Sequence, residues 1–477
     1  MADFDLVIRN AQAVTASDIF HCDIGVRDGR VVQLGLGLGP GSREIDAAGR
    51  AVTPGGVDTH CHLDQPQAPP VVSADDFLTG SRSAACGGTT TVIPFAAQHR
   101  GQSLRDAVDD YHRRAQGKSC IDYAFHLIVS DPTPTVLKEE LPALIAEGYT
   151  SFKIYMTYDD MKLDDRQILE VLDVARSHGA MAMIHAENSD CIAWLTGRLQ
   201  AAGKTAPRYH AHARPLLVER EATHRAIALS ELVDVPILIV HVSGREAVEQ
   251  IRWGRAHGLQ VFAETCPQYL FLTAEDLGID DSYEGAKCVC SPPPRDKANQ
   301  QVIWDGLADG LFTVISSDHA PYNFEGEGGK HPAGEEVPFN HIPNGIPGIE
   351  TRMALLWSEG VLGGRITPQK FVELTATNPA KAYGLHPRKG TIAVGGDADL
   401  VIWDEREFVL NNGMLHHAVD YTPYEGMRLA AWPGTTIARG QVVWDGTRYL
   451  GQAGHGRFLP CGLPTLLPAR REMAGGR

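Results

Sequence analysis

Five apolar runs decide the fold of this chain: TTTVIPF (89–95), TSFKIYM (150–156), AMAMIHA (180–186), VPILIVHVS (235–243) and LFTVISSDHA (311–320). They are rich in β-branched residues and are separated by stretches of helical periodicity, such as DRQILEVLDVARSHG (165–179). This α/β alternation predicts a parallel sheet, and closure into a (β/α)₈ TIM-like barrel is its simplest form. A doubly wound open sheet is the alternative, but no GxGxxG follows an early strand to support it.

The two ends of the chain have a different texture, with short alternating strands and turns. Strands are expected in FDLVIRNAQAV (4–14), DIGVRDGRVVQLG (23–35), DADLVIWD (397–404) and TTIARGQVVWDG (435–446). The sequence therefore predicts a β-sandwich domain made by both ends, residues 1–53 and 388–477, which is interrupted by a barrel domain, residues 54–387.

The composition argues against some classes of function. Lys and Arg number 43 against 59 Asp and Glu, a formal net charge of −16, which disfavours nucleic acid or an anionic membrane as partner. Neither a secretory signal nor an apolar stretch of membrane-spanning length is visible. The nine cysteines are scattered and odd in number, which indicates free thiols in a reducing compartment. We therefore expect a cytoplasmic protein.

A pair of histidines follows the first expected barrel strand, in VDTHCHLDQP (57–66). Residues two apart on an extended strand face the same side, so His60 and His62 can bind one cation while Cys61 points away. A lone HxH is more often incidental than functional. The preceding Pro-Gly-Gly and the apolar Val57 place this pair at a strand end, where barrel enzymes carry their sites.

Lys153 lies inside TSFKIYM, between Phe152 and Ile154. A lysine in such a run often extends its ammonium group to solvent, and the residues alone leave this alternative open. If the side chain is buried, the cost of burying its charge lowers its pKa and makes the amine a nucleophile towards CO₂. The resulting carbamate is an anion whose two oxygens can bridge two cations.

His185, His241 and Asp318 each end an apolar run. One such histidine is usually a core residue with satisfied hydrogen bonds, but two in successive strand–helix units favour a function. A carboxylate at a strand end is costly unless a metal or a donor meets it. With the histidine pair and the lysine, these residues place six nitrogen and oxygen ligands at one rim. The set suits two Zn²⁺ ions, with Mn²⁺ or Co²⁺ possible.

Motifs along nearly the whole chain resemble the amidohydrolase superfamily, and within it the hydantoinase/dihydropyrimidinase family. The matching motifs include TPGGVDTHCHLD, CGGTTTVIPF, SFKIYMTY, HAEN, VHVS, SPPPR, SDHAP, IPNGIPGIETRM and PRKGTIAVGGDADLVIWD. A generic barrel would not have these motifs in this order. The resemblance implies a homo-oligomer, commonly a tetramer, and a small cyclic amide or ureide as substrate.

The resemblance also implies a site, residue by residue. His60, His62 and Asp318 would bind the more buried metal ion, His185 and His241 the second, and carboxylated Lys153 would bridge the two. Tyr158, five residues after the lysine, would hydrogen-bond the developing oxyanion. Main-chain groups at Ser291 and Asn344 would hold the ring amide of the substrate. Asp318 would carry a proton from the attacking hydroxide to the leaving ring nitrogen, so Tyr158 and Asp318 are the expected catalytic residues.

The implied reaction opens the amide bond of hydantoins or 5,6-dihydropyrimidines and yields N-carbamoyl amino acids. Dihydroorotases usually carry an arginine two residues after the second histidine. Here Asp64 takes that place and is expected to repel a substrate carboxylate. An allantoinase or a cyclic-imide hydrolase stays an alternative. A catalytically inactive structural relative is an alternative of another class, but all six ligand positions are filled.

Three less regular segments also have an expected place. The loop QPQAPPVVSADDF (65–77) departs from the family's usual stretch and should line the pocket for the substrate's exocyclic substituent. The Gly/Pro-rich stretch 323–347 is long for a connection and is expected to be an active-site loop. The C-terminal LPTLLPARREMAGGR (463–477) is expected to be a tail or an oligomer contact.

Four further side chains are assigned from their position. Glu187 and Asn188 follow His185 by two and three residues and could orient that ligand. Trp194 and Trp253 lie in helical patterns, so the helical periodicity places both in the core.

Overall fold

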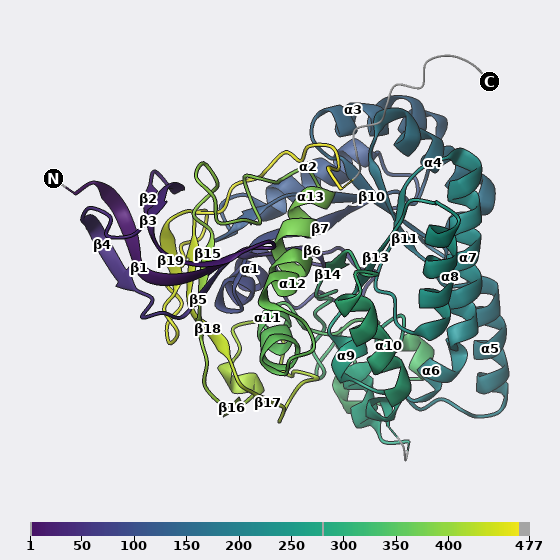
Figure 1. The fold of residues 1–477 in the computed structure, drawn as a ribbon. Helices are drawn as coiled ribbons and strands as arrows, with labels where there is room; N and C mark the ends of the chain where they lie inside the picture. The colour runs from purple at the N-terminus through teal and green to yellow at the C-terminus, as the bar shows by residue number, and fades with distance from the viewer. Residues whose placement is uncertain (1, 279–280, 467–477) are drawn as a thin grey trace.

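The computed structural model describes residues 2–278 and 281–466 of the 477-residue chain. A barrel of parallel strands fills the middle of the molecule, with helices around it and a sheet of the two chain ends beside it (Figure 1). The barrel strands are β6 (Gly56–Cys61), β7 (Thr89–Ala97), β8 (Asp122–Tyr123), β9 (His126–Ile128), β10 (Ser151–Tyr155), β11 (Met181–His185), β12 (Ile237–Ile239), β13 (Val261–Thr265) and β14 (Val314–Ile315).

Neighbouring barrel strands follow in the order β14-β13-β12-β11-β10-β9-β7-β6, with β8 added beside β7. The two ends of this path meet where Cys61 and His319 form a parallel bridge, and the N–H of His62 donates to the carbonyl of His319 at 2.7 Å. The side chains of β7, β10 and β11 are buried on both faces of the sheet, which explains why their sequences are apolar throughout and do not alternate between apolar and polar residues. The predicted TIM-like barrel is confirmed.

The α-helices follow the strands and cover the outside of the barrel. They are α1 (Phe77–Cys86), α2 (Leu104–Ala115), α3 (Leu141–Ala146), α4 (Asp165–His178), α5 (Ser189–Ala201), α6 (Tyr209–Ala213), α7 (Leu216–Val233), α8 (Arg245–Ala256), α9 (Gln268–Phe271), α10 (Lys297–Ala308), α11 (Arg352–Leu355), α12 (Pro368–Val372) and α13 (Asn378–Ala382).

Helix α4 shows how the sequence sets these bounds. Asp164 caps its first turn in a capping box with Gln167, and Gly179 ends it in the left-handed conformation, with φ of 72°. Its buried residues are Ile168, Val171, Leu172 and Ala175, the spacing of a single apolar face. The helix that follows Lys153 therefore packs on the barrel along one stripe.

Both chain ends contribute to one eight-stranded mixed sheet, as expected for a smaller β domain made from the two ends. Its order is β19-β18-β15-β5-β1-β2-β3, with β4 paired to β1. The strands are β1 (Phe4–Val14), β2 (Ile19–Arg27), β3 (Arg30–Gly35), β4 (Gly41–Asp46), β5 (Ala51–Pro54), β15 (Leu400–Asp404), β18 (Trp432–Ala438) and β19 (Gln441–Trp444). A separate pair joins β16 (Phe408–Val409) to β17 (Arg428–Leu429).

On the first crossing from the end sheet to the barrel, a single residue, Gly55, separates the two parts. Strand β5 of the end sheet ends at Pro54, and strand β6 of the barrel begins at Gly56. We propose on this ground the division into a barrel, 54–387, and a β domain, 1–53 and 388–477, whose last residues 467–477 lie outside the described part. The C-terminal segment also returns to the barrel, since Phe458 forms a bridge with Tyr123.

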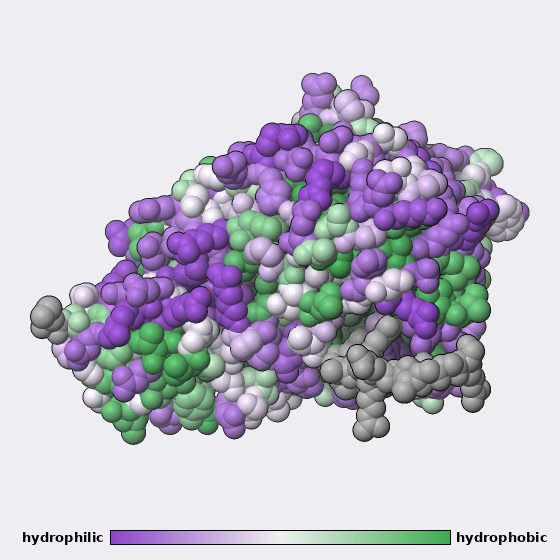
Figure 2. All heavy atoms as spheres, turned by 90° about the horizontal axis from the view of Figure 1, so that it is seen from above, coloured by the Kyte–Doolittle hydropathy of each residue, from purple (hydrophilic) through white to green (hydrophobic). Residues whose placement is uncertain are grey.

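The expectation for the two helical tryptophans is wrong. Trp194 on α5 is 62% exposed and Trp253 on α8 is 38% exposed. Helical spacing shows only that residues share a face, and each ring lies against polar neighbours instead. Trp194 lies against Arg198, and Trp253 lies against His257, the residue after α8, and against His224 on α7. Hydrophilic residues cover much of the face drawn in Figure 2, with smaller apolar patches between them. None of the described helices combines the length and apolar character that crossing a membrane requires.

Candidate metal centre

The six predicted ligands come together at the carboxyl end of the barrel strands. His60, Lys153 and His185 lie in β6, β10 and β11, near the ends of those strands. His62, His241 and Asp318 follow β6, β12 and β14 by one to three residues. Five of the side chains are buried and His62 is partly exposed. The structure therefore brings together side chains that are up to 258 positions apart in the sequence.

One half of this group is formed by His60, His62 and Asp318. Nε2 of His60 lies 3.2 Å from Oδ1 of Asp318, and Nε2 of His62 lies 3.4 Å from the same oxygen. Their three ligand atoms lie within 4.8 Å of one another. Two imidazole nitrogens and a carboxylate oxygen at this spacing can hold one divalent ion.

Both histidines of this half are oriented through the opposite ring nitrogen. Nδ1 of His60 lies 2.6 Å from Oε1 of Glu264, and Nδ1 of His62 lies 2.5 Å from Oε1 of Gln65. Since an imidazole that donates from Nδ1 keeps its lone pair on Nε2, both rings present that lone pair to the shared point. Glu264 was not among the site residues predicted from the sequence. Its only signal is a carboxylate inside the apolar strand run VFAET (261–265).

The other half is formed by His185 and His241. Nδ1 of His185 lies 2.9 Å from Nε2 of His241, and Nε2 of His185 lies 2.7 Å from Oε2 of Glu187. Glu187 thus takes the orienting role expected of it, and Arg214 donates to the same carboxylate oxygen at 2.7 Å. Asn188 instead caps α5 by accepting from the N–H of Cys191 at 3.0 Å.

Lys153 lies between the two halves. It is 1% exposed, its Nζ is 2.8 Å from Nε2 of His60, and the rings of Phe95 and Tyr155 lie 4.7 and 4.8 Å from that nitrogen. The extension to solvent that the sequence left open is therefore wrong. Burial lowers the pKa of Lys153 to about 8, against the charges of Asp318 and Glu264, so a useful fraction of the amine is neutral near physiological pH.

The surroundings shift the pKa values of three ligands, His60, His241 and Asp318, towards their metal-binding protonation states. Burial, and then the charge of Lys153, lowers the pKa of His60 well below its ordinary value. Burial and the neighbouring His185 do the same for His241. Burial raises the pKa of Asp318, but the adjacent His62 and His241 and the charge of Lys153 outweigh it and lower that pKa overall. Neutral imidazoles and an ionised carboxylate are the forms that bind divalent ions.

A cavity of about 250 Å³ is lined by five of the six predicted ligands and also by Tyr158, Ser291 and Asn344. The hydroxyl of Ser291 donates to Oδ1 of Asn344 at 3.2 Å. Tyr158 has a left-handed backbone, with φ of 67°, as do His241 and Asp318, with φ of 40° and 48°. Strained backbone of this kind collects at functional sites, where the fold holds side chains in place.

The loop after the histidine pair borders the same cavity through Gln65, Gln67 and Val71, as expected of a pocket-lining loop. Asp64 does not behave as expected. Its carboxylate lies 2.9 Å from Arg114 and 3.6 Å from Lys118, and it is not among the residues that line the cavity. Because Asp64 is paired with Arg114 and does not line the cavity, it is not placed to repel a substrate carboxylate there.

Two other features lie outside this site. Cys86, Glu350 and His416 also bring potential ligand atoms together. There Glu350 already accepts hydrogen bonds from His416 and from Ser83, which satisfies the carboxylate without an ion.

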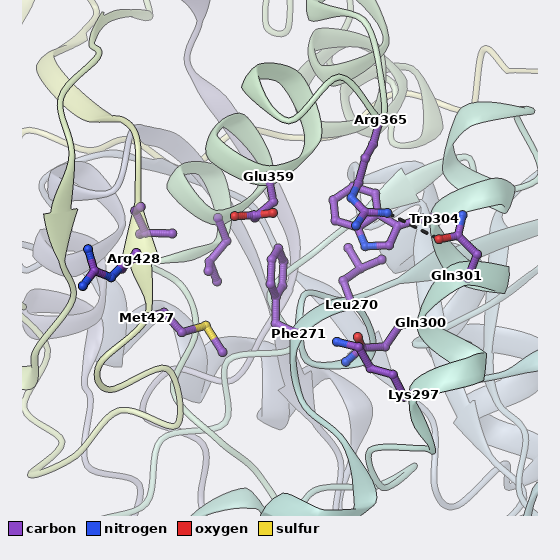
Figure 3. A pocket seen from close by; sticks show the side chains of 12 residues that line it. Leu270, Phe271, Lys297, Gln300, Gln301, Trp304, Glu359, Arg365, Met427 and Arg428 are labelled. Carbon is purple, nitrogen blue, oxygen red and sulfur yellow. Dashed lines mark hydrogen bonds between the residues drawn. The ribbon is translucent and has the colours of Figure 1, made fainter.

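A second cavity, of about 410 Å³, lies beside α9 and α10, and none of the predicted site residues line it. On its wall Arg365 lies over the ring of Trp304 and donates a hydrogen bond to Gln301 (Figure 3).

Comparison with known proteins agrees with this geometry. A model of the amidohydrolase family matches residues 51–443. A D-hydantoinase from Ralstonia pickettii is 47% identical over 457 residues, which are 95% of this chain and 98% of that enzyme. The crystal structure of a dihydropyrimidinase from Brevibacillus agri matches with a TM-score of 0.93 at 42% identity, covering 98% of this chain and 99% of that one.

A more distant structure, an L-hydantoinase (dihydropyrimidinase) from Arthrobacter aurescens, matches with a TM-score of 0.85 at 29% identity, covering 95% of this chain and 99% of that one. Relatives of this identity, matched over nearly their whole length, share both the barrel and the end sheet. The chain belongs to the amidohydrolase family, and within it to the hydantoinases and dihydropyrimidinases.

Proposed function

We propose that this protein is a cyclic amidohydrolase that opens the amide bond of hydantoins or 5,6-dihydropyrimidines to give N-carbamoyl amino acids. The observation that carries the proposal is the convergence of four histidines, an aspartate and a buried lysine of lowered pKa at one end of a barrel. The relatives named D-hydantoinase and dihydropyrimidinase support the substrate class.

The ligand set fits two divalent ions, with Zn²⁺ the best match and Mn²⁺ or Co²⁺ as alternatives. His60, His62 and Asp318 would hold one ion, His185 and His241 the other, and Lys153 in its carboxylated form would bridge them. Such a pair, when bound, would lower the pKa of a water molecule and polarise the amide carbonyl. The inward-facing Nε2 atoms of His60 and His62 support this assignment.

The residues of the chain divide the remaining work. Asp318 takes the proton of the attacking water and delivers it to the ring nitrogen as the amide bond breaks. Tyr158 donates a hydrogen bond to the oxygen that becomes negative, and since burial raises its pKa to about 12, its hydroxyl keeps its proton at neutral pH. Main-chain groups at Ser291 and Asn344 hold the ring amide and supply part of the binding energy of the substrate ring, before and during the reaction alike.

A substrate panel together with metal analysis tests this function. Purified protein should contain about two divalent ions per chain and open hydantoin or dihydrouracil rings. Allantoin and cyclic imides belong in the same panel, because Gln65 and Gln67 give the cavity polar lining. Fewer than one tightly bound ion per chain, with no ring opened, would instead support an inactive structural relative.

Two broader properties complete the proposal. We infer a homotetramer from the resemblance to the family, to be checked by analytical ultracentrifugation. All nine cysteines are free thiols, and eight of them are buried, which fits a reducing compartment such as the cytoplasm.

A further inference from the structure

Lys330 lies in the long loop 323–347 and is fully buried, with 0% of its surface exposed. Within residues 2–278 and 281–466, no carboxylate forms an ion pair with it. Burying a charged group without a counter-charge is costly, so such lysines are rare in proteins. The loop therefore places an expensive side chain where an apolar residue would pack more cheaply.

The side chain of Lys330 is satisfied by main-chain oxygens alone. Its Nζ donates to the carbonyl of Val289 at 2.8 Å and to the carbonyl of Pro343 at 2.9 Å. Its own backbone is fixed as well, because its carbonyl accepts from the hydroxyl of Tyr283 at 2.7 Å and its N–H donates to Asn323 at 2.9 Å. Burial lowers the pKa of Lys330 to about 7, and both the ammonium and the neutral amine have enough N–H groups for the two carbonyls.

The two carbonyls belong to the two segments that carry the proposed substrate contacts. Val289 is two residues before Ser291, and Pro343 directly precedes Asn344. The segments touch at two further points, from the N–H of Gly345 to the carbonyl of Val289 at 3.1 Å and from Ser291 to Asn344. Gly345 has φ of 152°, and a side chain there would come within 2.4 Å of Ala320, so this approach leaves little freedom.

We propose that Lys330 is a positioning residue that sets the spacing between the main chain at Ser291 and the main chain at Asn344, and through it the affinity for the substrate ring. The inference rests on the proposed function, since it takes these two segments as the holders of the ring amide. Lys330 does not line the cavity, so its effect must pass through the two carbonyls.

The expected consequence is a change in KM and not in kcat. Main-chain groups that hold the ring amide do so before and during the reaction, so their displacement weakens ground state and transition state alike. Asp318 and Tyr158 belong to other segments of the chain, and the proposal leaves them in place. A residue with a purely structural role would lower the thermal stability without raising KM.

The test compares Lys330→Met with the wild-type protein and with Lys287→Met. Lys287 is a partly exposed lysine nearby, whose ammonium pairs with Glu284 and lies over the ring of Phe324, and it serves as the matched control. Lys330→Met should raise KM about tenfold, change kcat less than about threefold and keep the wild-type metal content. Lys330→Gln has a shorter side chain that still carries N–H donors, so it should give an intermediate KM. This variant tests the positioning role if the methionine variant does not fold.

An unchanged KM in a folded Lys330 variant, with only the melting temperature lowered, would overturn the inference and leave the proposed function intact. If the wild-type protein opens no ring in the panel above, the proposed function fails and the inference fails with it.

Discussion

Two fully buried lysines at opposite ends of the barrel show how differently this fold treats the same side chain. Lys153 at the carboxyl end is 1% exposed and Lys389 at the other end is 2% exposed. Lys389 lies 2.7 Å from Asp122, 3.0 Å from Asp397 and 2.6 Å from Asp399. The nitrogen of Lys153 has the imidazole of His60 at 2.8 Å and forms no ion pair among the described residues.

The two surroundings shift the lysine pKa in opposite directions. Burial lowers the pKa of both, but the three aspartates outweigh it and raise that of Lys389. For Lys153 burial prevails and its pKa falls to about 8. Lys389 is therefore a permanent cation that ties Asp122 of the barrel to Asp399 beside the end sheet. Lys153 has an amine that can react. In TIM barrels the carboxyl end carries the chemistry and the other end the stability, and these lysines follow that division.

The largest effect is expected for Lys153→Ala. Loss of the proposed bridging carbamate should reduce kcat by more than about 10³-fold, because both ions lose a shared ligand. Short carboxylic acids added with Zn²⁺ should restore part of the activity by supplying a carboxylate in its place. Turnover near the wild-type level without such additions would exclude the bridging role.

Lys389→Met should have the opposite profile. Removing the cation leaves the buried Asp399 without its ion pair, while Arg439 still pairs with Asp122 and Arg388 with Asp397. Breaking this buried pair should lower the free energy of unfolding by about 3–5 kcal/mol in chemical denaturation. The folded fraction should keep its kcat. The double variant Lys389→Met/Asp399→Asn should recover part of the stability. Equal destabilisation by Lys153→Ala in metal-free protein would erase the distinction between the two lysines.

Glu264→Gln sharpens the comparison at the carboxyl end. It replaces the carboxylate that orients His60 by an amide of the same size, and a change of this kind should weaken metal affinity about 10- to 100-fold. Glu350→Gln is the matched control, because Glu350 is also buried and also bonds a histidine, His416, but outside the site. Metal titration of the two variants measures the difference. A larger loss of metal affinity in Glu350→Gln than in Glu264→Gln would mean that the ions bind at the cluster of Cys86, Glu350 and His416 and not at the barrel site.

The smallest effect concerns pH. Lys153 reacts with CO₂ only as the neutral amine, and with its pKa near 8 the amine is mostly protonated at pH 7 and mostly neutral at pH 9. At constant dissolved CO₂, reactivation of metal-free, decarboxylated protein should accelerate about fivefold from pH 7 to pH 8 and then level off near pH 9. An amine with the ordinary lysine pKa would instead accelerate about tenfold per pH unit over this whole range.

The sequence predicted strands and their ends better than contacts between them. The spacing and composition of the apolar residues located the ends of the strand segments that carry Lys153, His185 and His241. A barrel of parallel strands brings all such ends to one rim. Glu264 was missed because its contact with His60, 204 positions away, depends on how the barrel closes and brings β13 close to β6. Asp64 was misjudged for a similar reason, since Arg114 lies 50 positions further along the chain.

Burial was the second quantity that the sequence could not supply. Lys153 and Trp194 both lie in apolar surroundings in the sequence, yet the lysine is buried and the tryptophan is mostly exposed. Lys330 had no sequence signal beyond its place in a long Gly/Pro-rich loop. Its burial comes from the fold of that loop over the SPPPR segment.

The central claim is that Lys153, in a carboxylated form, bridges two metal ions at the carboxyl end of the barrel. A crystal structure of protein purified without chelators, with anomalous diffraction measured at the zinc edge, tests it most directly. The account predicts two anomalous peaks joined by a carbamate on Lys153, one bound by His60, His62 and Asp318 and the other by His185 and His241. A single peak, or an unmodified Lys153 amine beside two ions, would contradict it.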